Sequence, residues 1–336
     1  MKKSFALPNR KIIYFLLSLL LLLFSSLIAL SVGSVQIPLS ETWAVLGGKG
    51  EAASRNILLF LRLPRVIEAA VIGAGLAVVG AFLQGLLRNP LADPYVLGIS
   101  SGAAFGATIA ILVGWGLFGI GASAFGAALL TIYTVYLIAR SGSRLSVTSL
   151  LLAGIALSTF LSALIALLML LHHEQMTKIF YWTMGSFNLV FWDKVLFSAP
   201  LILLGSILLY FFARDLNVIM TGEETAEHLG IDTERVKHWI LLLASLITAA
   251  AVSTTGIIGF VGLIVPHIAR LLVGPDNRGL IPFTALCGAL FLIWTDLLAR
   301  TILAPAEIPV GIITSALGGP FFVYLLIKAK KNTKGS

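Results

Sequence analysis

The sequence predicts an all-α polytopic membrane protein with about ten transmembrane helices in one domain, residues 1–336. Two observations carry this prediction. Mean hydropathy is +1.01 and only 11% of residues are charged, whereas a soluble domain carries roughly 25% charged residues. Apolar runs long enough to cross a bilayer, which takes about 20 residues, also recur along the whole chain.

Each expected span is an apolar run bounded by polar residues, glycine or proline. The first run, 12–30, follows a basic N-terminus and exceeds the apolar core of a signal peptide, roughly 7–15 residues, so we expect an uncleaved helix. Residues 33–61 are too mixed to span. The ten expected spans are 12–30, 64–87, 95–113, 115–139, 145–171, 195–213, 236–253, 259–273, 280–298 and 308–327.

Two further patterns refine this picture. Small residues recur every fourth position in the third span, which predicts a helix that neighbouring backbones approach closely; they are Gly98, Gly102, Gly106, Ala110 and Gly114. Residues 172–194 are rich in aromatic side chains, which favours a helix at the membrane interface or over the outer mouth.

The distribution of basic residues predicts the orientation. Ten spans place both termini on one side, and 16 of the 23 Lys and Arg residues fall on that side. Because cytoplasmic loops are enriched in Lys and Arg, both termini and the polar loop 214–237 are expected in the cytoplasm.

The loop 214–237 is the longest polar interruption between the spans. Thr221 and Glu224 have capping-box spacing, Gly230 suits the left-handed end of a helix, and Asp232 suits the start of the next helix. We therefore expect a capped helix of about two turns. It is either a docking surface for a partner or an ordered loop without one.

Three arginines, Arg62, Arg65 and Arg300, fall on the expected outer side, against the positive-inside bias. Helical spacing allows Arg65 to pair with Glu68 and Arg300 with Asp296. Alternatively, the three form a basic rim for an acidic partner.

Nothing in the sequence favours catalysis. The sequence lacks P-loop, HExxH, GxSxG and CxxC patterns, and the single cysteine, Cys287, excludes a disulfide framework. His172, His173 and Glu174 could hold a metal, but a solvated loop is the favoured interpretation. We expect no cofactor and no enzymatic activity in this chain.

Six blocks of the sequence resemble the FecCD family, the permeases of type II ABC importers for iron–siderophore complexes, haem and cobalamin. They occur in the family's order across nearly the whole chain: RLPR at 62–65, RNPLADPYVLGISSGA at 88–103, LLAGIALS at 151–158, YWTMGSF at 181–187, GFVGLIVPHIARLLVGPDNR at 259–278 and EIPVGIITSALGGPFFVYLL at 307–326.

The resemblance implies two permease subunits around one pathway, two cytoplasmic ATPase subunits and an external substrate-binding protein, in a bacterial cell membrane. It also implies roles for particular residues. The ATPase-coupling residues would be Gly222, Glu223, Glu224, Ala226, Leu229, Gly230 and Asp232. Arg62, Arg65 and Arg300 would dock the binding protein, and Ser158, Thr159 and Ser162 would line the pathway.

The implied mechanism is alternating access driven by ATP, with an iron–siderophore complex as the expected substrate and haem or cobalamin as alternatives. An ion-coupled secondary carrier is a rival, but such carriers hold carboxylates near the midplane, and Glu68 and Asp296 lie near span ends. A membrane enzyme would need a polar catalytic cluster. A homodimer and a heterodimer with a paralogue both remain open.

Overall fold

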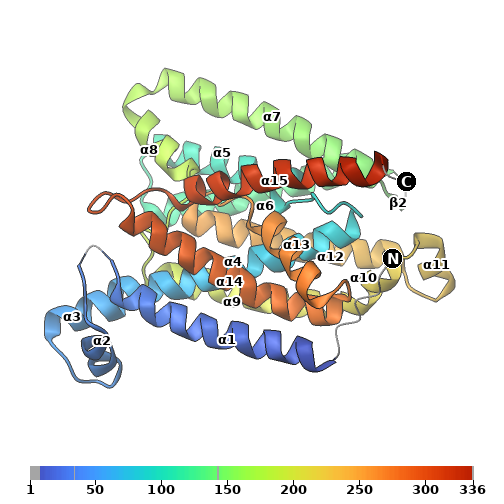
Figure 1. The fold of residues 1–336 in the computed structure, drawn as a ribbon. Coiled ribbons are helices and arrows are strands. Elements are labelled where there is room, and N and C mark those ends of the chain that lie inside the picture. The colour runs from blue at the N-terminus through green and yellow to red at the C-terminus, as the bar shows by residue number, and fades with distance from the viewer. Residues whose placement is uncertain (1–7, 34, 142–143, 335–336) are drawn as a thin grey trace.

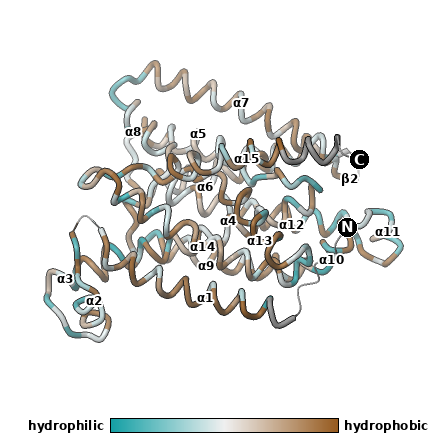
Figure 2. The backbone as a smooth tube through the Cα atoms, viewed as in Figure 1, coloured by the Kyte–Doolittle hydropathy of each residue, from teal (hydrophilic) through white to brown (hydrophobic). Residues whose placement is uncertain are grey.

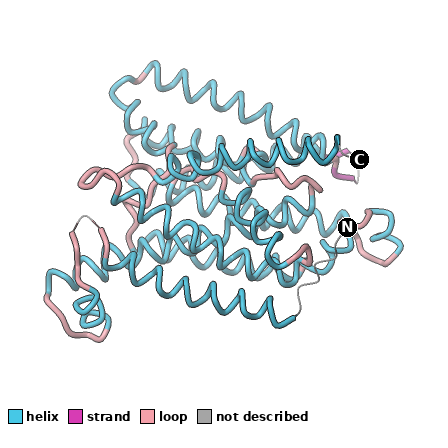
Figure 3. Tube along the Cα trace, in the orientation of Figure 1, coloured by secondary structure: helices cyan, strands magenta, loops and turns pink. Residues whose placement is uncertain are grey.

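The computed structural model describes residues 8–33, 35–141 and 144–334, and nearly all of this chain is helical (Figures 1 and 3). The basic segment 1–7, expected to precede the first span, lies outside the described residues. The helices are α1 (Pro8–Ser31), α2 (Leu39–Leu46), α3 (Ala52–Asn56), η1 (Ile57–Arg62), α4 (Leu63–Leu86), η2 (Pro94–Leu97), α5 (Ile99–Leu112), α6 (Leu117–Ala139), α7 (Val147–Leu171), α8 (His173–Thr183), α9 (Trp192–Phe211), α10 (Ala213–Ile219), α11 (Glu223–His228), α12 (Thr233–Thr255), α13 (Val261–Val273), α14 (Asn277–Thr301) and α15 (Val310–Lys334). Two short strands, β1 (Arg140–Ser141) and β2 (Arg144–Leu145), pair antiparallel.

The all-α prediction is confirmed. Within the described residues, eight helices are long and apolar enough to span a membrane, and α5 and α13 are shorter apolar helices. Together they account for the ten expected spans. Apolar residues run along the helices of the bundle, whereas polar residues gather in the loops at its two ends (Figure 2).

The start expected for the second span was wrong. The candidate span runs from Ala52 to Leu86, because α3, the π-helical η1 and α4 follow one another without a break. Pro64 occupies a position in the first turn of α4, where a missing N–H costs nothing to the helix that follows. The mixed composition of 52–61 concealed a helix whose polar residues lie toward the end of the bundle.

α4 is the central helix of the bundle, with 83% of its apolar window buried, and it packs against α9, α12, α13 and α14. Glycines allow two of these approaches. A Cβ atom on Gly73 would overlap the backbone of Gly288 in α14, and one on Gly80 would overlap the backbone of Gly262 in α13. The helix backbones therefore touch directly, as small residues allow in membranes.

The glycine ladder of the third expected span also packs as predicted. A Cβ atom on Gly102 would overlap Thr131 of α6, and one on Gly106 would overlap the Ser123 backbone of the same helix. Gly98, with φ +83°, forms the left-handed start of α5. This conformation is easily adopted by glycine alone.

Several helices on the periphery are poorly covered. Only 17% of the α1 and α7 windows, 28% of the α9 and α15 windows and 33% of the α6 window are buried. In Figure 1, α7 and α15 lie along the same side of the bundle, and α1 lies on the opposite side.

The bundle has two distinct ends. α1 begins and α15 ends at the end that carries α11, hereafter the α11 end, whereas α2, α3 and α8 lie at the opposite end, the α8 end (Figure 1). α8 is the helix that the aromatic segment 172–194 predicted.

Candidate functional site

A short helix projects from the α11 end, between α10 and α12 (Figure 1). Gly222 precedes it with φ +154°, and Gly230 follows it with φ +82°. The Ile231 N–H donates to the Ala226 carbonyl at 3.0 Å, which closes the helix end. Asp232 then accepts from the Arg235 N–H at 3.0 Å and caps α12. The predictions that Gly230 ends this helix in the left-handed conformation and that Asp232 caps the next helix are confirmed.

The expected capping box was wrong. Gly222, not Thr221, is the residue before α11, and no side chain caps it. The Thr221 hydroxyl donates backward to the Val218 carbonyl at 2.7 Å, so it belongs to the end of α10. Glu223 and Glu224 still occupy the first turn, where negative charge is favourable.

A buried lysine anchors α11 to the membrane helices. The Lys237 ammonium donates to Glu223 at 2.6 Å and to Glu234 at 2.9 Å, and its side chain is 3% exposed. Thr233 donates to Glu227 at 3.0 Å. These contacts join the first and last turns of α11 to the first turn of α12.

α10 connects the same loop to two further spans. The Arg88 guanidinium, at the end of α4, donates to the Ile219 carbonyl at 2.7 Å. The Asn217 amide donates to Asp276 at 2.8 Å and accepts from the side chain of the fully buried Asn277 at 2.8 Å. Short polar contacts therefore join α11 to α12, and α10 to α4 and α14.

The outer face of α11 has no covering within the described chain. Ala226 is fully buried against the subunit, whereas the apolar side chain of Leu229 is 68% exposed. Glu224, Gly230 and Asp232 are also exposed, and Glu223 is partly exposed. The exposed face of α11 thus combines one large apolar side chain with polar and acidic residues.

At the α8 end, Arg65 makes a bridge between helices. Its guanidinium donates to Asp296 of α14 at 2.8–3.1 Å and to Glu307, in the loop before α15, at 2.9 Å. The expected pairing of Arg65 with Glu68 was wrong. Glu68 is fully buried and accepts instead from Ser198 at 2.7 Å and from Thr254 at 2.9 Å.

Arg62 and Arg300 cap the end of α1. Arg62 donates to the carbonyls of Leu30 at 2.6 Å and Ser31 at 2.8 Å, and also to that of Val35. Arg300 donates to the Ala29 carbonyl at 2.6 Å and forms the expected ion pair with Asp296 at 3.6 Å. The last carbonyls of a helix lack partners within it and attract cations.

All three arginines are therefore engaged inside the subunit, with exposures of 4–8%. Their described contacts are those of a brace that holds α1, α4, α14 and the loop before α15 together.

The residues expected to line the pathway lie on α7. Ser158 is half-buried and near Gly98, whereas Thr159 and Ser162 are exposed on the uncovered part of the helix. The Thr159 hydroxyl donates to the Ile155 carbonyl at 2.9 Å. This face is apolar apart from a few hydroxyls.

A partly buried loop carboxyl lies between α4 and α5. Asp93 accepts from the Tyr95 N–H at 3.0 Å and caps η2. Burial disfavours the charged form and raises the pKa of Asp93 to about 6.

Among the described residues, no group of three or more His, Cys, Asp or Glu side chains could hold a metal ion.

Sequence reasoning missed several of these residues. Lys237 looked like one basic residue of a loop, yet it is the anchor of α11. Glu307 and Asn217 gave no signal, because their partners lie far away in the sequence.

Comparisons with known proteins agree with this geometry. Residues 21–328 match the FecCD transport family. The chain is 41% identical to an uncharacterized ABC transporter permease of Bacillus subtilis, with 98% of each chain covered. It is 46% identical to a cobalamin import system permease of Halobacterium salinarum over 79% of this chain and 72% of the relative. Other relatives are named for hemin, molybdate and ferric citrate transport.

A solved structure, a metal-chelate type ABC transporter in an inward-facing conformation, superposes with a TM-score of 0.84 at 34% identity, covering 94% of this chain and 98% of that chain. The match extends over nearly all the helices described above. This chain is a multi-span membrane permease and belongs to the FecCD transport family of ABC transporter permeases.

Proposed function

We propose that this chain is the permease subunit of an ATP-driven importer that carries an iron chelate, an iron–siderophore complex first of all, into the cytoplasm. The observation that carries the proposal is the position of α11. This exposed helix is joined by polar contacts to α12 and, through α10, to α4 and α14. Cytoplasmic ATPase subunits would move α11, and α4, α12 and α14 would move with it.

The orientation follows from the same proposal. The α11 end faces the cytoplasm with both termini, and the α8 end faces the outside of the plasma membrane, in agreement with the bias of basic residues. A substrate-binding protein would deliver the chelate at the α8 end.

A second permease subunit fits the uncovered side of the bundle. α7 and α15 lie on the same side and expose most of their surface, and Ser158, Thr159 and Ser162 lie on α7. Two such sides facing each other would enclose a weakly polar pathway for a bulky substrate. A second copy of this chain and a paralogue would both meet this requirement.

Docking of the binding protein on Arg62, Arg65 and Arg300 stays a prediction. Their burial and their internal partners support a bracing role, which leaves little of their charge for another protein. The docking role requires these side chains to exchange partners when the binding protein arrives.

Cobalamin uptake is the second candidate, because the relative named for cobalamin import has 46% identity to this chain. The ion-coupled carrier is less well supported. Glu68 is a buried carboxylate in a span, as such carriers need, but it lies at the α8 end of α4 and already accepts two hydroxyl hydrogen bonds.

Coupling is tested by co-expressing the chain with the ATPase and any second permease encoded beside it, and comparing Leu229→Asp with Leu46→Asp. Leu46 is an exposed leucine of α2 at the other end. We expect Leu229→Asp to abolish copurification of the ATPase and ATP-driven chelate uptake, with the fold intact, and Leu46→Asp to preserve both. Normal uptake by Leu229→Asp would refute the coupling role of α11.

A further inference from the structure

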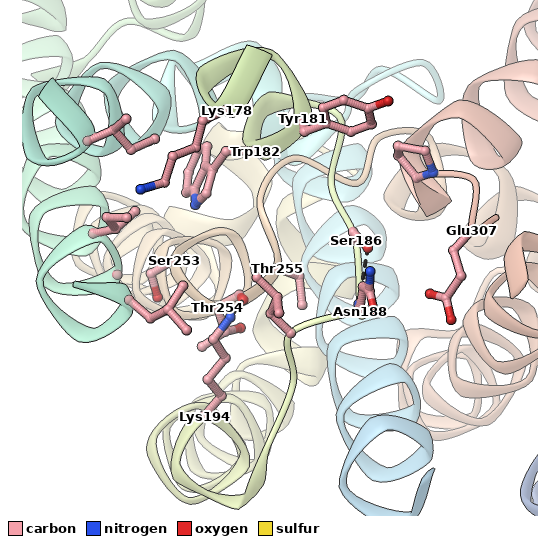
Figure 4. Close-up of a pocket in the computed structure, with 16 residues that line it drawn as sticks. Lys178, Tyr181, Trp182, Ser186, Asn188, Lys194, Ser253, Thr254, Thr255 and Glu307 are labelled. Atoms are coloured by element: carbon pink, nitrogen blue, oxygen red, sulfur yellow. Dashed lines mark hydrogen bonds between the residues drawn. The ribbon is translucent and has the colours of Figure 1, made fainter. Parts of the chain in front are cut away.

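Two adjoining cavities lie at the α8 end, and the proposed transport mechanism uses neither. The first, of about 320 Å³, lies behind α8 and is lined by polar groups that include Lys178, Ser186, Asn188 and Lys194 (Figure 4). The second, of about 230 Å³, lies between α6 and α9 and is lined mainly by apolar groups. The cavities share the lining residues Leu117, Gly121, Lys194, Ser253 and Thr254.

The first cavity has two ammonium groups on opposite walls. Lys178 reaches in from α8 and Lys194 from α9 (Figure 4). Among the described residues neither lysine forms an ion pair. Lys194 uses one N–H to donate to the Thr254 carbonyl at 2.8 Å, which leaves two of its three donors.

Carboxylates occur nearby, but they have other positions or partners. Asp193 lines the second cavity, and Glu307 lines the first cavity while it pairs with Arg65. Glu68, in α4, accepts hydrogen bonds from Ser198 and Thr254. The first cavity thus presents two ammonium groups, flanked by hydroxyl and amide groups, to an anionic group. It also contains the Glu307 carboxylate, whose charge Arg65 offsets, and Lys194 is attracted by Asp193 and Glu68.

The second cavity lies between α6 and α9, which are both candidate spans with poorly covered surfaces. Phe118, 85% exposed, lies at the α8 end of α6, and deeper in the cavity Phe125 and Phe197 meet edge to face with ring centroids 5.6 Å apart. Aromatic side chains at this level are typical of the membrane interface.

We infer that the two cavities together bind one anionic phospholipid of the outer leaflet. The phosphate lies between Lys178 and Lys194, the rest of the headgroup contacts Ser186 and Asn188, and one acyl chain lies between α6 and α9. The two ammonium groups lie in the first cavity, and the second cavity continues from it between α6 and α9, which is the order of headgroup and acyl chain in a phospholipid. Two ammonium groups favour a lipid with a net negative charge over a zwitterionic one.

The test is native mass spectrometry of the purified complex with added phosphatidylglycerol, and with phosphatidylcholine as the zwitterionic comparison. Lys178→Gln/Lys194→Gln removes both cations, and Lys49→Gln is the matched control at an exposed lysine of the same end. Each lysine near a lipid phosphate contributes about 1 kcal/mol. We therefore expect roughly 30-fold weaker phosphatidylglycerol binding in the double variant and unchanged binding in the control.

The acyl-chain cavity is tested on the same helix. Gly121→Leu fills it, because a Cβ there already lies 3.2 Å from the Ser253 carbonyl, whereas Gly126→Leu points into open space. We expect lipid retention to fall only in Gly121→Leu. Equal retention by the lysine variant and its control would overturn the inference. So would displacement of the lipid by free glycerol phosphate, which would indicate an anion site, or by the transported chelate, which would indicate a substrate site.

Discussion

Removal of the Lys237 ammonium should detach α11 from the membrane helices without unfolding them. The lysine donates to Glu223 of α11 and to Glu234 of its own helix, and among the described ion pairs only the Glu223 contact links α11 to α12. A helix of six residues has no stability of its own in water, because nucleation is costly and few hydrogen bonds follow. Lys237→Met keeps the apolar part of the side chain and leaves two carboxylates without their cation.

The size of the effect follows from the one contact that joins the two helices. A hydrogen bond to a charged group contributes about 1.5–3 kcal/mol. The Glu223 side chain is 42% exposed, so water replaces much of what it loses. We therefore expect α11 to be destabilised by about 1 kcal/mol, which corresponds to a roughly 5-fold increase in its opening.

Hydrogen exchange at residues 223–230 measures this opening directly. In Lys237→Met, exchange there should accelerate roughly 5-fold, while exchange in α4 and α14 stays unchanged, and ATP-driven uptake should fall. Lys237→Arg should restore most of the protection, and Lys49→Met, a change at an exposed lysine of the α8 end, should have no effect. Unchanged exchange in Lys237→Met would refute the anchoring role.

Two further predictions concern the opposite end and the loop before α5. Arg300→Gln removes two buried charge-assisted contacts, so it should lower the free energy of unfolding by about 2–4 kcal/mol. Binding-protein capture by the folded fraction should persist, whereas lost capture at unchanged stability would favour the docking role. For Asp93, the raised pKa means that the folded state holds a proton more tightly than the unfolded state. The stability that this tighter proton binding gives to the folded state is therefore full below about pH 4 and is lost as pH rises to about 6. The stability of the wild type relative to Asp93→Asn should fall by about 2–3 kcal/mol between pH 4 and pH 7, and parallel stability curves for the two proteins would contradict this.

The fold was largely readable from the sequence because lipid restricts spans to continuous apolar helices. The spans and the helix α8 were predicted for that reason. The start of the second span was not, because Ser54, Arg55, Asn56 and Arg62 interrupt the apolar residues before Pro64, and no local signal marks a π-helical turn at η1.

The candidate site was predictable only where its geometry is local. Gly230 and Asp232 end and begin helices whose nearest residues are one to three positions away, and these two capping positions were predicted correctly. Thr221 was assigned to the wrong helix, since the choice depends on the backbone of Gly222, which composition does not reveal. Arg65 lies one turn from Glu68, yet it reaches Asp296, 231 residues away, because packing of α4 on α14 decides its partner.

The glycine contacts of α4 limit how the subunit can move during transport. If α4 slid by one turn, about 5.4 Å, Ala77 would replace Gly73 opposite Gly288 and Gln84 would replace Gly80 opposite Gly262, and each new Cβ would collide with backbone. α4, α13 and α14 therefore have one register and behave as a single rigid body. We expect the nucleotide-driven rearrangement to be a rotation of this whole body, with the strain taken up where α7 and α15 meet the neighbouring subunit.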